Sequence, residues 1–267
     1  MDAETGTLPS GHPYARLERG TRVVLLIPGL TYTADPPTQR DLDQDLPGWP
    51  EAATDHDLDV WRIGRRGDLP VGSTVQDIAD DYAAVVRTTF PGPIGVYGTG
   101  TGGAYAMWLA IRYPDLVGRL ALGFTGHKLH PDTARAQRRF ASLAGQGRWR
   151  SAYGAAGPLY FPRHQRLASA AFWMLGPWLA GRPKDPVVLQ LDAAAEAGHD
   201  AMSRLEAIQC PTLVVSGGRD GAYPPGVVRD LLEGLPHAEH IEYPKAGHFG
   251  PGAEAARDVA TFLAKDG

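Results

Sequence analysis

One short stretch constrains the fold of this chain more than any other. Residues Ile94 to Tyr97 have the apolar, β-branched pattern of a buried strand, and six small residues, Gly98 to Gly103, lead from them directly into an apolar helix. A strand that turns into a helix within so few residues needs small flanking positions, because the two backbones pass close together. Such a unit is typical of a mostly parallel sheet covered by helices, and we predict this α/β class for the chain.

The rest of the chain repeats this alternation of strand and helix patterns. Predicted strands cover Arg22–Ile27, Leu58–Ile63, Ile94–Tyr97, Leu120–Phe124, Thr212–Ser216 and Glu239–Tyr243, and predicted helices cover Thr74–Thr88, Gly102–Tyr113, Pro225–Leu235 and Ala253–Lys265. Only helical patterns occur from about 127 to 199. We therefore predict one α/β core, residues 1–126 and 200–267, with a helical cap or lid formed by residues 127–199.

The glycine-rich turn is also reminiscent of two phosphate-binding motifs. A P-loop requires a Lys-Ser/Thr pair after its glycines, and none follows here. Gly98, Gly100 and Gly103 do fit G-x-G-x-x-G, but this strand is not the first of the sheet, and no acidic residue ends a strand about 20 positions further on. We therefore expect no nucleotide and no other cofactor.

Two polar residues follow strands in the C-terminal half. Asp220 comes after the Thr212–Ser216 strand, and His248 lies in a Gly-rich loop after the last strand. Taken alone, such an Asp is more often a helix cap, and such a His is usually just exposed. The order of glycine-rich turn, Asp and His, each after its own strand, instead predicts a His–Asp pair that faces the turn at Gly100.

These motifs together resemble the α/β-hydrolase superfamily, from about Tyr14 to Lys265. The chain is similar to small bacterial esterase-like hydrolases whose strand-to-helix turn, the nucleophile elbow, reads G-T-S-T-G-G. Here Gly98 to Gly103 read G-T-G-T-G-G. The nucleophilic serine therefore does not carry over, because position 100 is glycine.

The resemblance implies roles for the remaining site residues. Asp220 would orient His248, and the backbone N–H groups of Leu30 and Thr101 would stabilise an oxyanion. The residues expected to line the substrate site beside them are Gly29, Tyr32 and Thr99. A register shifted by one residue would place the Thr101 hydroxyl at the centre of the elbow, although Thr99 would then occupy a position that favours glycine.

A site without its serine has no group to acylate, but it keeps a general base and an oxyanion hole. The first hypothesis is a cofactor-independent enzyme of non-hydrolytic type, which carries out elimination, lyase, cyclisation or isomerisation chemistry on a small, mostly apolar carbonyl or ester metabolite, polyketide-like in character. The second is an esterase or thioesterase whose serine was replaced by Gly100. The third is a non-catalytic protein that binds a small molecule.

Aromatic residues of the predicted cap are expected to form the walls of the pocket under the first hypothesis. These residues are Phe140, Trp149, Tyr153, Tyr160, Phe161, Phe172, Trp173 and Trp178.

Composition excludes several partners. The net charge is −4, and the Arg-rich segments (Arg62, Arg65 and Arg66; Arg135, Arg138 and Arg139) are short and interpreted as solvated faces, so we expect no nucleic acid. Two H-x-x-H pairs, His127/His130 and His237/His240, have no third ligand in evidence, so we expect no metal. Met1 to Gly11 has no apolar core of a signal peptide and Cys210 is the single cysteine, which predicts a cytoplasmic protein without membrane contact. A homodimer through the cap is also considered.

Overall fold

The computed structural model of the protein describes residues 3–17, 19–160, 166–179, 182–183 and 185–265. The strands are β1 (Glu4–Thr7), β2 (Pro13–Arg16), β3 (Arg22–Ile27), β4 (Leu58–Ile63), β5 (Ile94–Thr99), β6 (Val117–Gly123), β7 (Thr212–Gly217) and β8 (Glu239–Tyr243). The helices are α1 (Gln39–Asp45), α2 (Trp49–Asp55), α3 (Val75–Thr89), α4 (Thr101–Arg112), α5 (Pro131–Gly145), α6 (Trp149–Tyr160), α7 (Arg166–Leu179), α8 (Val187–Glu196), the 3₁₀ helix η1 (Met202–Ala207), α9 (Pro225–Gly234) and α10 (Ala253–Leu263).

The strands form one eight-stranded sheet in the order β1-β2-β4-β3-β5-β6-β7-β8. All neighbours from β4 to β8 are parallel, and the two N-terminal strands add an antiparallel edge. The predicted fold class is therefore confirmed, and β3, β4 and β8 coincide with their predicted ranges. The sequence analysis missed the four-residue strands β1 and β2 and the seven-residue helices α1 and α2, because strands and helices this short do not show a clear period.

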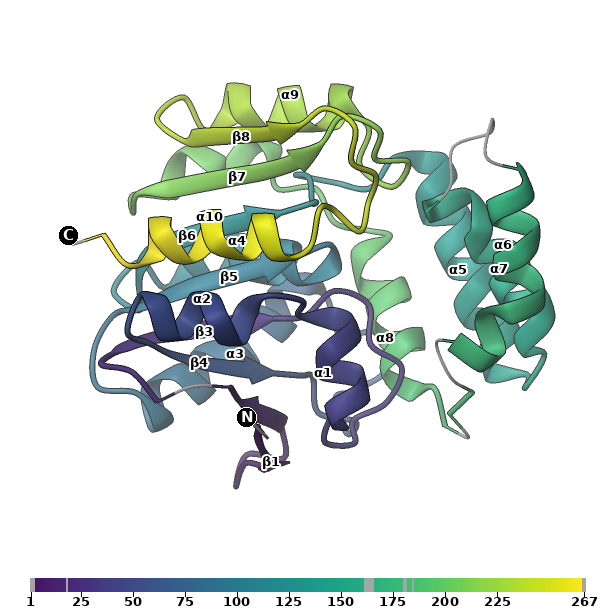
Figure 1. The fold of residues 1–267 in the computed structure, drawn as a ribbon, viewed down its shortest axis with the longest axis horizontal. Coiled ribbons are helices and arrows are strands. Elements are labelled where there is room, and N and C mark those ends of the chain that lie inside the picture. The colour runs from purple at the N-terminus through teal and green to yellow at the C-terminus, as the bar shows by residue number, and fades with distance from the viewer. Residues whose placement is uncertain (1–2, 18, 161–165, 180–181, 184, 266–267) are drawn as a thin grey trace.

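The sheet is covered on both faces because successive side chains of a strand point to opposite sides. On β3, Leu25 and Ile27 pack under α3 and α4, whereas Val24 and Leu26 pack under α2 and α10. Figure 1 shows α2 and α10 in front of the sheet. Burial of each such side chain contributes about 1.5–3 kcal/mol. A strand buried on both faces reads as a continuous apolar run, which is why β3 was recognisable in the sequence.

Helices α5 to α8 lie in the connection between β6 and β7. In Figure 1, α5, α6 and α7 form a bundle beside the sheet, and α8 lies between this bundle and the sheet. Helix α8 contacts both α5 and α4, so it joins the bundle to the core. The division into a core and a separate cap at residues 127–199 stays a prediction. Among the described residues, no helix is both long enough and apolar enough to cross a membrane.

Candidate active site

The turn between β5 and α4 is as tight as the sequence predicted. A Cβ atom on Gly98 would lie 2.5 Å from the Gly102 carbonyl oxygen, and a Cβ on Gly102 would lie 2.2 Å from the Ile27 carbonyl oxygen. Both positions therefore require glycine. Gly100 lies at the apex, with φ 52° and ψ −124°, a backbone conformation that side-chain-bearing residues rarely adopt. Its carbonyl accepts a hydrogen bond from the Thr125 hydroxyl (2.8 Å), which ties the apex to the end of β6.

Gly100 faces the imidazole of His248. A Cβ atom on residue 100 would lie 3.6 Å from His248 Nε2 and 3.8 Å from the Cα of Gly29, which are ordinary van der Waals distances. The direction in which a side chain would leave position 100 therefore leads to the imidazole. A Cβ at this position fits without any movement of these neighbours.

The His248 ring is held by Asp220. His248 Nδ1 and Asp220 Oδ2 are 3.0 Å apart, and the Asp220 side chain is almost fully buried. The second carboxylate oxygen accepts hydrogen bonds from the backbone N–H groups of Ala222 (2.7 Å) and Tyr223 (3.0 Å). Asp220 thus both caps the turn after β7 and orients the imidazole. The two interpretations of an Asp after a strand do not exclude each other here.

Electrostatics favour a basic imidazole. Burial alone would lower the pKa of His248, but the negative charge and hydrogen bond of Asp220 outweigh it, so the pKa is raised above its ordinary value of 6.5. With Nδ1 donating its proton to Asp220, Nε2 is the nitrogen that can accept a proton.

The two expected oxyanion donors flank the apex. Thr101 is the first residue of α4, so its N–H has no acceptor within the helix. Leu30 follows Gly29, whose Cα lies beside position 100. The Thr101 hydroxyl donates its proton to the Glu196 carboxylate (2.6 Å). A hydroxyl held in this way is not paired with His248 as a nucleophile would be. This contact argues against the shifted register.

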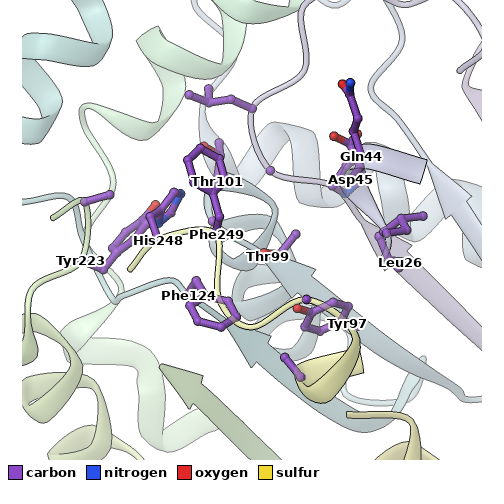
Figure 2. Close-up of a pocket in the computed structure, with 18 of the residues that line it drawn as sticks. Leu26, Gln44, Asp45, Tyr97, Thr99, Thr101, Phe124, Tyr223, His248 and Phe249 are labelled. Carbon is purple, nitrogen blue, oxygen red and sulfur yellow. The ribbon is translucent and has the colours of Figure 1, made fainter. Parts of the chain in front are cut away.

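A pocket of about 350 Å³ opens over this turn. Of the predicted site residues, Gly29, Leu30, Tyr32, Thr99, Gly100, Thr101 and His248 line it, while Asp220 lies behind His248. Apolar walls come from several elements and include Leu26, Trp49, Phe124, Leu129 and Phe249. Figure 2 shows His248 beside Tyr223, with Phe124 below them. A pocket with these walls suits a small, mostly apolar ligand.

Comparison with known proteins identifies the family of this chain. The family model described as alpha/beta hydrolase fold matches residues 17–252. This chain belongs to the α/β-hydrolase family. It is 31% identical over 199 residues to a pimeloyl-[acyl-carrier protein] methyl ester esterase of Chromobacterium violaceum. The matched stretch covers 70% of this chain and 75% of that protein.

Solved α/β-hydrolase structures show the same fold. The enol-lactonase of Burkholderia xenovorans LB400 superposes with a TM-score of 0.73 at 20% identity and covers 98% of this chain and 100% of that one. A thermophilic esterase of Thermogutta terrifontis superposes with a TM-score of 0.69 at 22% identity, over 98% and 95% of the two chains.

The expectation that aromatic side chains of the cap line the pocket is wrong for those that the structure describes. Phe140, Trp149 and Tyr153 pack on one another and on Tyr32, which brings the bundle and the pocket rim together. Trp173 and Trp178 are exposed on α7. The side chains of Tyr160, Phe161 and Phe172 lie outside the described part of the chain. Helix α5 instead contributes the polar Thr133 and Gln137 to the pocket wall.

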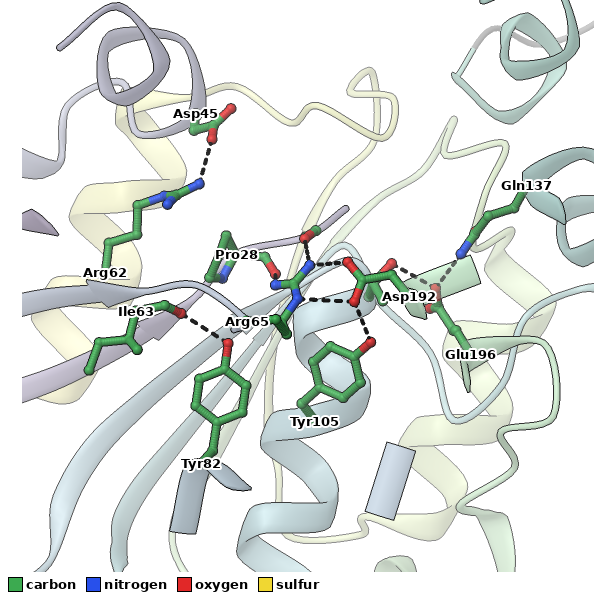
Figure 3. Close-up of polar contacts among 12 residues, drawn as sticks. Pro28, Asp45, Arg62, Ile63, Arg65, Tyr82, Tyr105, Gln137, Asp192 and Glu196 are labelled. Atoms are coloured by element: carbon green, nitrogen blue, oxygen red, sulfur yellow. Dashed lines mark hydrogen bonds and ion pairs between the residues drawn. The ribbon is translucent and has the colours of Figure 1, made fainter. Parts of the chain in front are cut away.

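A buried polar network behind the turn after β3 was not predicted. The Arg65 guanidinium forms an ion pair with Asp192 of α8, and both side chains are fully buried. The interpretation of Arg62 and Arg65 as a solvated face is therefore wrong, because they are only 5% and 1% exposed. Arg135, Arg138 and Arg139 are exposed as expected. Figure 3 shows Arg65 between Pro28 and Asp192.

A second buried acid, Glu196, lies one helical turn after Asp192. Its carboxylate accepts hydrogen bonds from Thr101, from Gln137 (2.8 Å) and from the Tyr223 hydroxyl. Burial raises the pKa of Glu196, although its three donors oppose this shift. No sequence signal pointed to these acids. They lie on a mostly apolar helix, and their burial becomes apparent only when α8 packs against α4. Among the described residues, no group of three or more His, Cys, Asp and Glu side chains is arranged to hold a metal ion.

Proposed function

We propose that this chain is a cofactor-independent α/β-hydrolase-family enzyme that works without a serine nucleophile. His248, oriented by Asp220, is the general base, and the backbone N–H groups of Leu30 and Thr101 stabilise the oxyanion. The substrate is a small, mostly apolar ester or other carbonyl compound. One observation carries the proposal. A Cβ atom on residue 100 would lie 3.6 Å from His248 Nε2, but Gly100 has no side chain to acylate.

Two first steps use the same residues. In one, His248 Nε2 takes a proton from a water held beside Gly100, and the resulting hydroxide attacks the carbonyl carbon. The tetrahedral oxyanion then collapses and expels the alkoxide, which takes the proton back from His248. In the other, Nε2 takes a proton from the carbon beside the carbonyl, which leaves an enolate for elimination, cyclisation or isomerisation.

The similar proteins named above are an esterase, a lactonase and another esterase. Their named activities support the first route, ester hydrolysis by an activated water, over the lyase or cyclase chemistry of the second. Polyketide-like substrates have no support from these comparisons. In the first route the empty space at Gly100 has a function, since it can accept the water that replaces the serine hydroxyl.

The test is an untargeted mass-spectrometric comparison of metabolite extracts incubated with the wild type and with His248→Ala. Loss of the base is expected to reduce turnover by about 10²–10⁴-fold. His240→Ala is a matched control, because His240 contacts Ser216 (2.9 Å) and does not line the pocket. Serine-directed phosphonates should leave the wild type unlabelled. Turnover that persists in His248→Ala contradicts the proposal, and a ligand that binds both proteins equally without turnover would identify a binding protein.

A serine hydrolase that has lost its nucleophile is a second candidate. The observation that favours it is the backbone at Gly100, which keeps the strained conformation and the open space that a serine would need. In that case Gly100→Ser restores hydrolysis of small activated esters, whereas the wild type turns over no natural substrate.

A further inference from the structure

We propose that Arg65, held by Asp192, is a positioning residue that aims the Leu30 N–H into the oxyanion hole. This inference rests on the proposed function in that it assumes an oxyanion forms beside Gly100. It concerns how the donor is held, and its test needs no turnover.

The contacts of Arg65 begin the argument. Its guanidinium donates to the carbonyl oxygens of Pro28 (2.6 Å) and Gly29 (2.5 Å) and to both oxygens of Asp192. The planar fork of Arg fixes the directions of these bonds, which a flexible ammonium group would not do. Two successive carbonyls of the turn after β3 are therefore held at defined angles.

The peptide group connects this contact to the site. The Gly29 carbonyl and the Leu30 N–H belong to one planar trans peptide, so they point in opposite directions. Holding the carbonyl toward Arg65 turns the N–H away from Arg65. Gly29 and Leu30 line the pocket, and the Cα of Gly29 lies 3.8 Å from the Cβ position of residue 100. In this proposal the direction away from Arg65 is the one that leads toward the reacting centre.

Asp192 fixes Arg65 in turn. Its side chain is fully buried and also accepts a hydrogen bond from the Tyr105 hydroxyl of α4 (2.7 Å). Glu196, one turn later on α8, accepts the hydroxyl of Thr101, the residue that carries the other donor. Asp192 therefore acts on the Pro28 and Gly29 carbonyls through Arg65, whereas Glu196 holds the side chain of Thr101.

A purely structural role predicts different behaviour. A buried ion pair is weak evidence for stability, because desolvation offsets its attraction. If Arg65 only joined α8 to the core, its replacement would weaken all ligands alike. If it positions a donor, its replacement weakens anionic ligands and spares neutral ligands of the same shape.

The probes are 4-nitrophenolate and its neutral analogue 4-nitrotoluene, titrated at a pH at which the phenol is ionised. The measured quantity is the ratio of their affinities. Arg65→Met alone leaves Asp192 buried without its partner, so the double variant Arg65→Met/Asp192→Asn is measured beside it. Arg66→Met is the matched control, since Arg66 pairs with Asp68 and Asp81 and makes no contact with the turn.

We expect the preference for the phenolate to fall roughly 10- to 100-fold in the double variant, the range of one hydrogen bond to a charged group. Affinity for 4-nitrotoluene should stay within about twofold, and Arg66→Met should behave as the wild type. Arg65→Lys should recover part of the preference. A folded double variant with an unchanged ratio overturns the inference, as does a wild type without any preference for the phenolate. Loss of turnover in His248→Ala tests the proposed function separately.

Discussion

Replacement of Gly100 by serine tests the geometry of the elbow directly. The Cβ of the new residue would have its nearest neighbours at 3.6, 3.7 and 3.8 Å, so the Cβ itself makes only ordinary van der Waals contacts. The hydroxyl lies one bond beyond this Cβ, and rotation about χ1 brings it within the roughly 2.6–3.2 Å that a nucleophile–base hydrogen bond requires. Asp220 and His248 are already paired at 3.0 Å. The substitution therefore completes a Ser-His-Asp triad.

The cost of this substitution comes from the backbone alone. At φ 52° and ψ −124° a residue with a side chain is strained by about 1–3 kcal/mol. For a domain of this size the melting temperature should fall by roughly 2–12 °C. Gly100→Ala carries the same strain without a hydroxyl and is the matched control. The difference between the two variants isolates the chemistry from the strain.

The gain is measured with 4-nitrophenyl acetate and a serine-directed phosphonate. Loss of a serine nucleophile costs about 10⁶-fold in kcat in a well-studied protease, so even a poorly adapted triad should exceed Gly100→Ala by about 10²-fold or more. Gly100→Ser should also show a burst and take up one phosphonate. Gly100→Ser could have the same melting temperature as Gly100→Ala and yet fail both to hydrolyse the ester and to react with the phosphonate. That result would show that position 100 does not face His248.

Four further predictions concern the same turn and its base. Turnover by the wild type should rise with pH through the raised pKa of His248, and Asp220→Asn should move the midpoint to lower pH, as a pH–rate profile would reveal. The stabilisation from this pair is complete below about pH 6.5 and is lost as pH rises through the folded-state pKa, so wild type and Asp220→Asn should differ most in acid melting curves. Glu196→Gln removes a charge that raises the pKa of His248, so the acid limb of the profile should move to lower pH; an unmoved limb would contradict this. Gly102→Ala places a Cβ 2.2 Å from the Ile27 carbonyl oxygen and should lower the free energy of unfolding by about 1–3 kcal/mol or more in urea titrations, while an unchanged midpoint would show that the turn relaxes.

Much of the site follows from local signals. The elbow could be predicted because glycine is required at positions 98 and 102 by contacts with residues that are close in sequence or on the adjacent strand. The place of Asp220 and His248 in the site could be predicted because each follows a strand, and the carboxyl ends of parallel strands meet at one edge of the sheet. Their pairing could thus be expected before any distance was known.

Other parts of the site had no such signal. The residues next to Arg65 in the sequence do not distinguish a buried arginine from a solvated one. Its burial depends on Asp192, which is 127 positions away. Helix α8 contributes this acid only because it packs against α4.

The α/β class, the glycine at the apex of the elbow and the order of Asp220 and His248 can be read from the amino-acid order alone, since these depend on local sterics and on strand order. The groups that hold the turn after β3, and the aromatic side chains that stay out of the pocket, became known from the folded arrangement. A buried charge or ring takes its role from partners that are remote in the chain, and long-range packing brings those partners together.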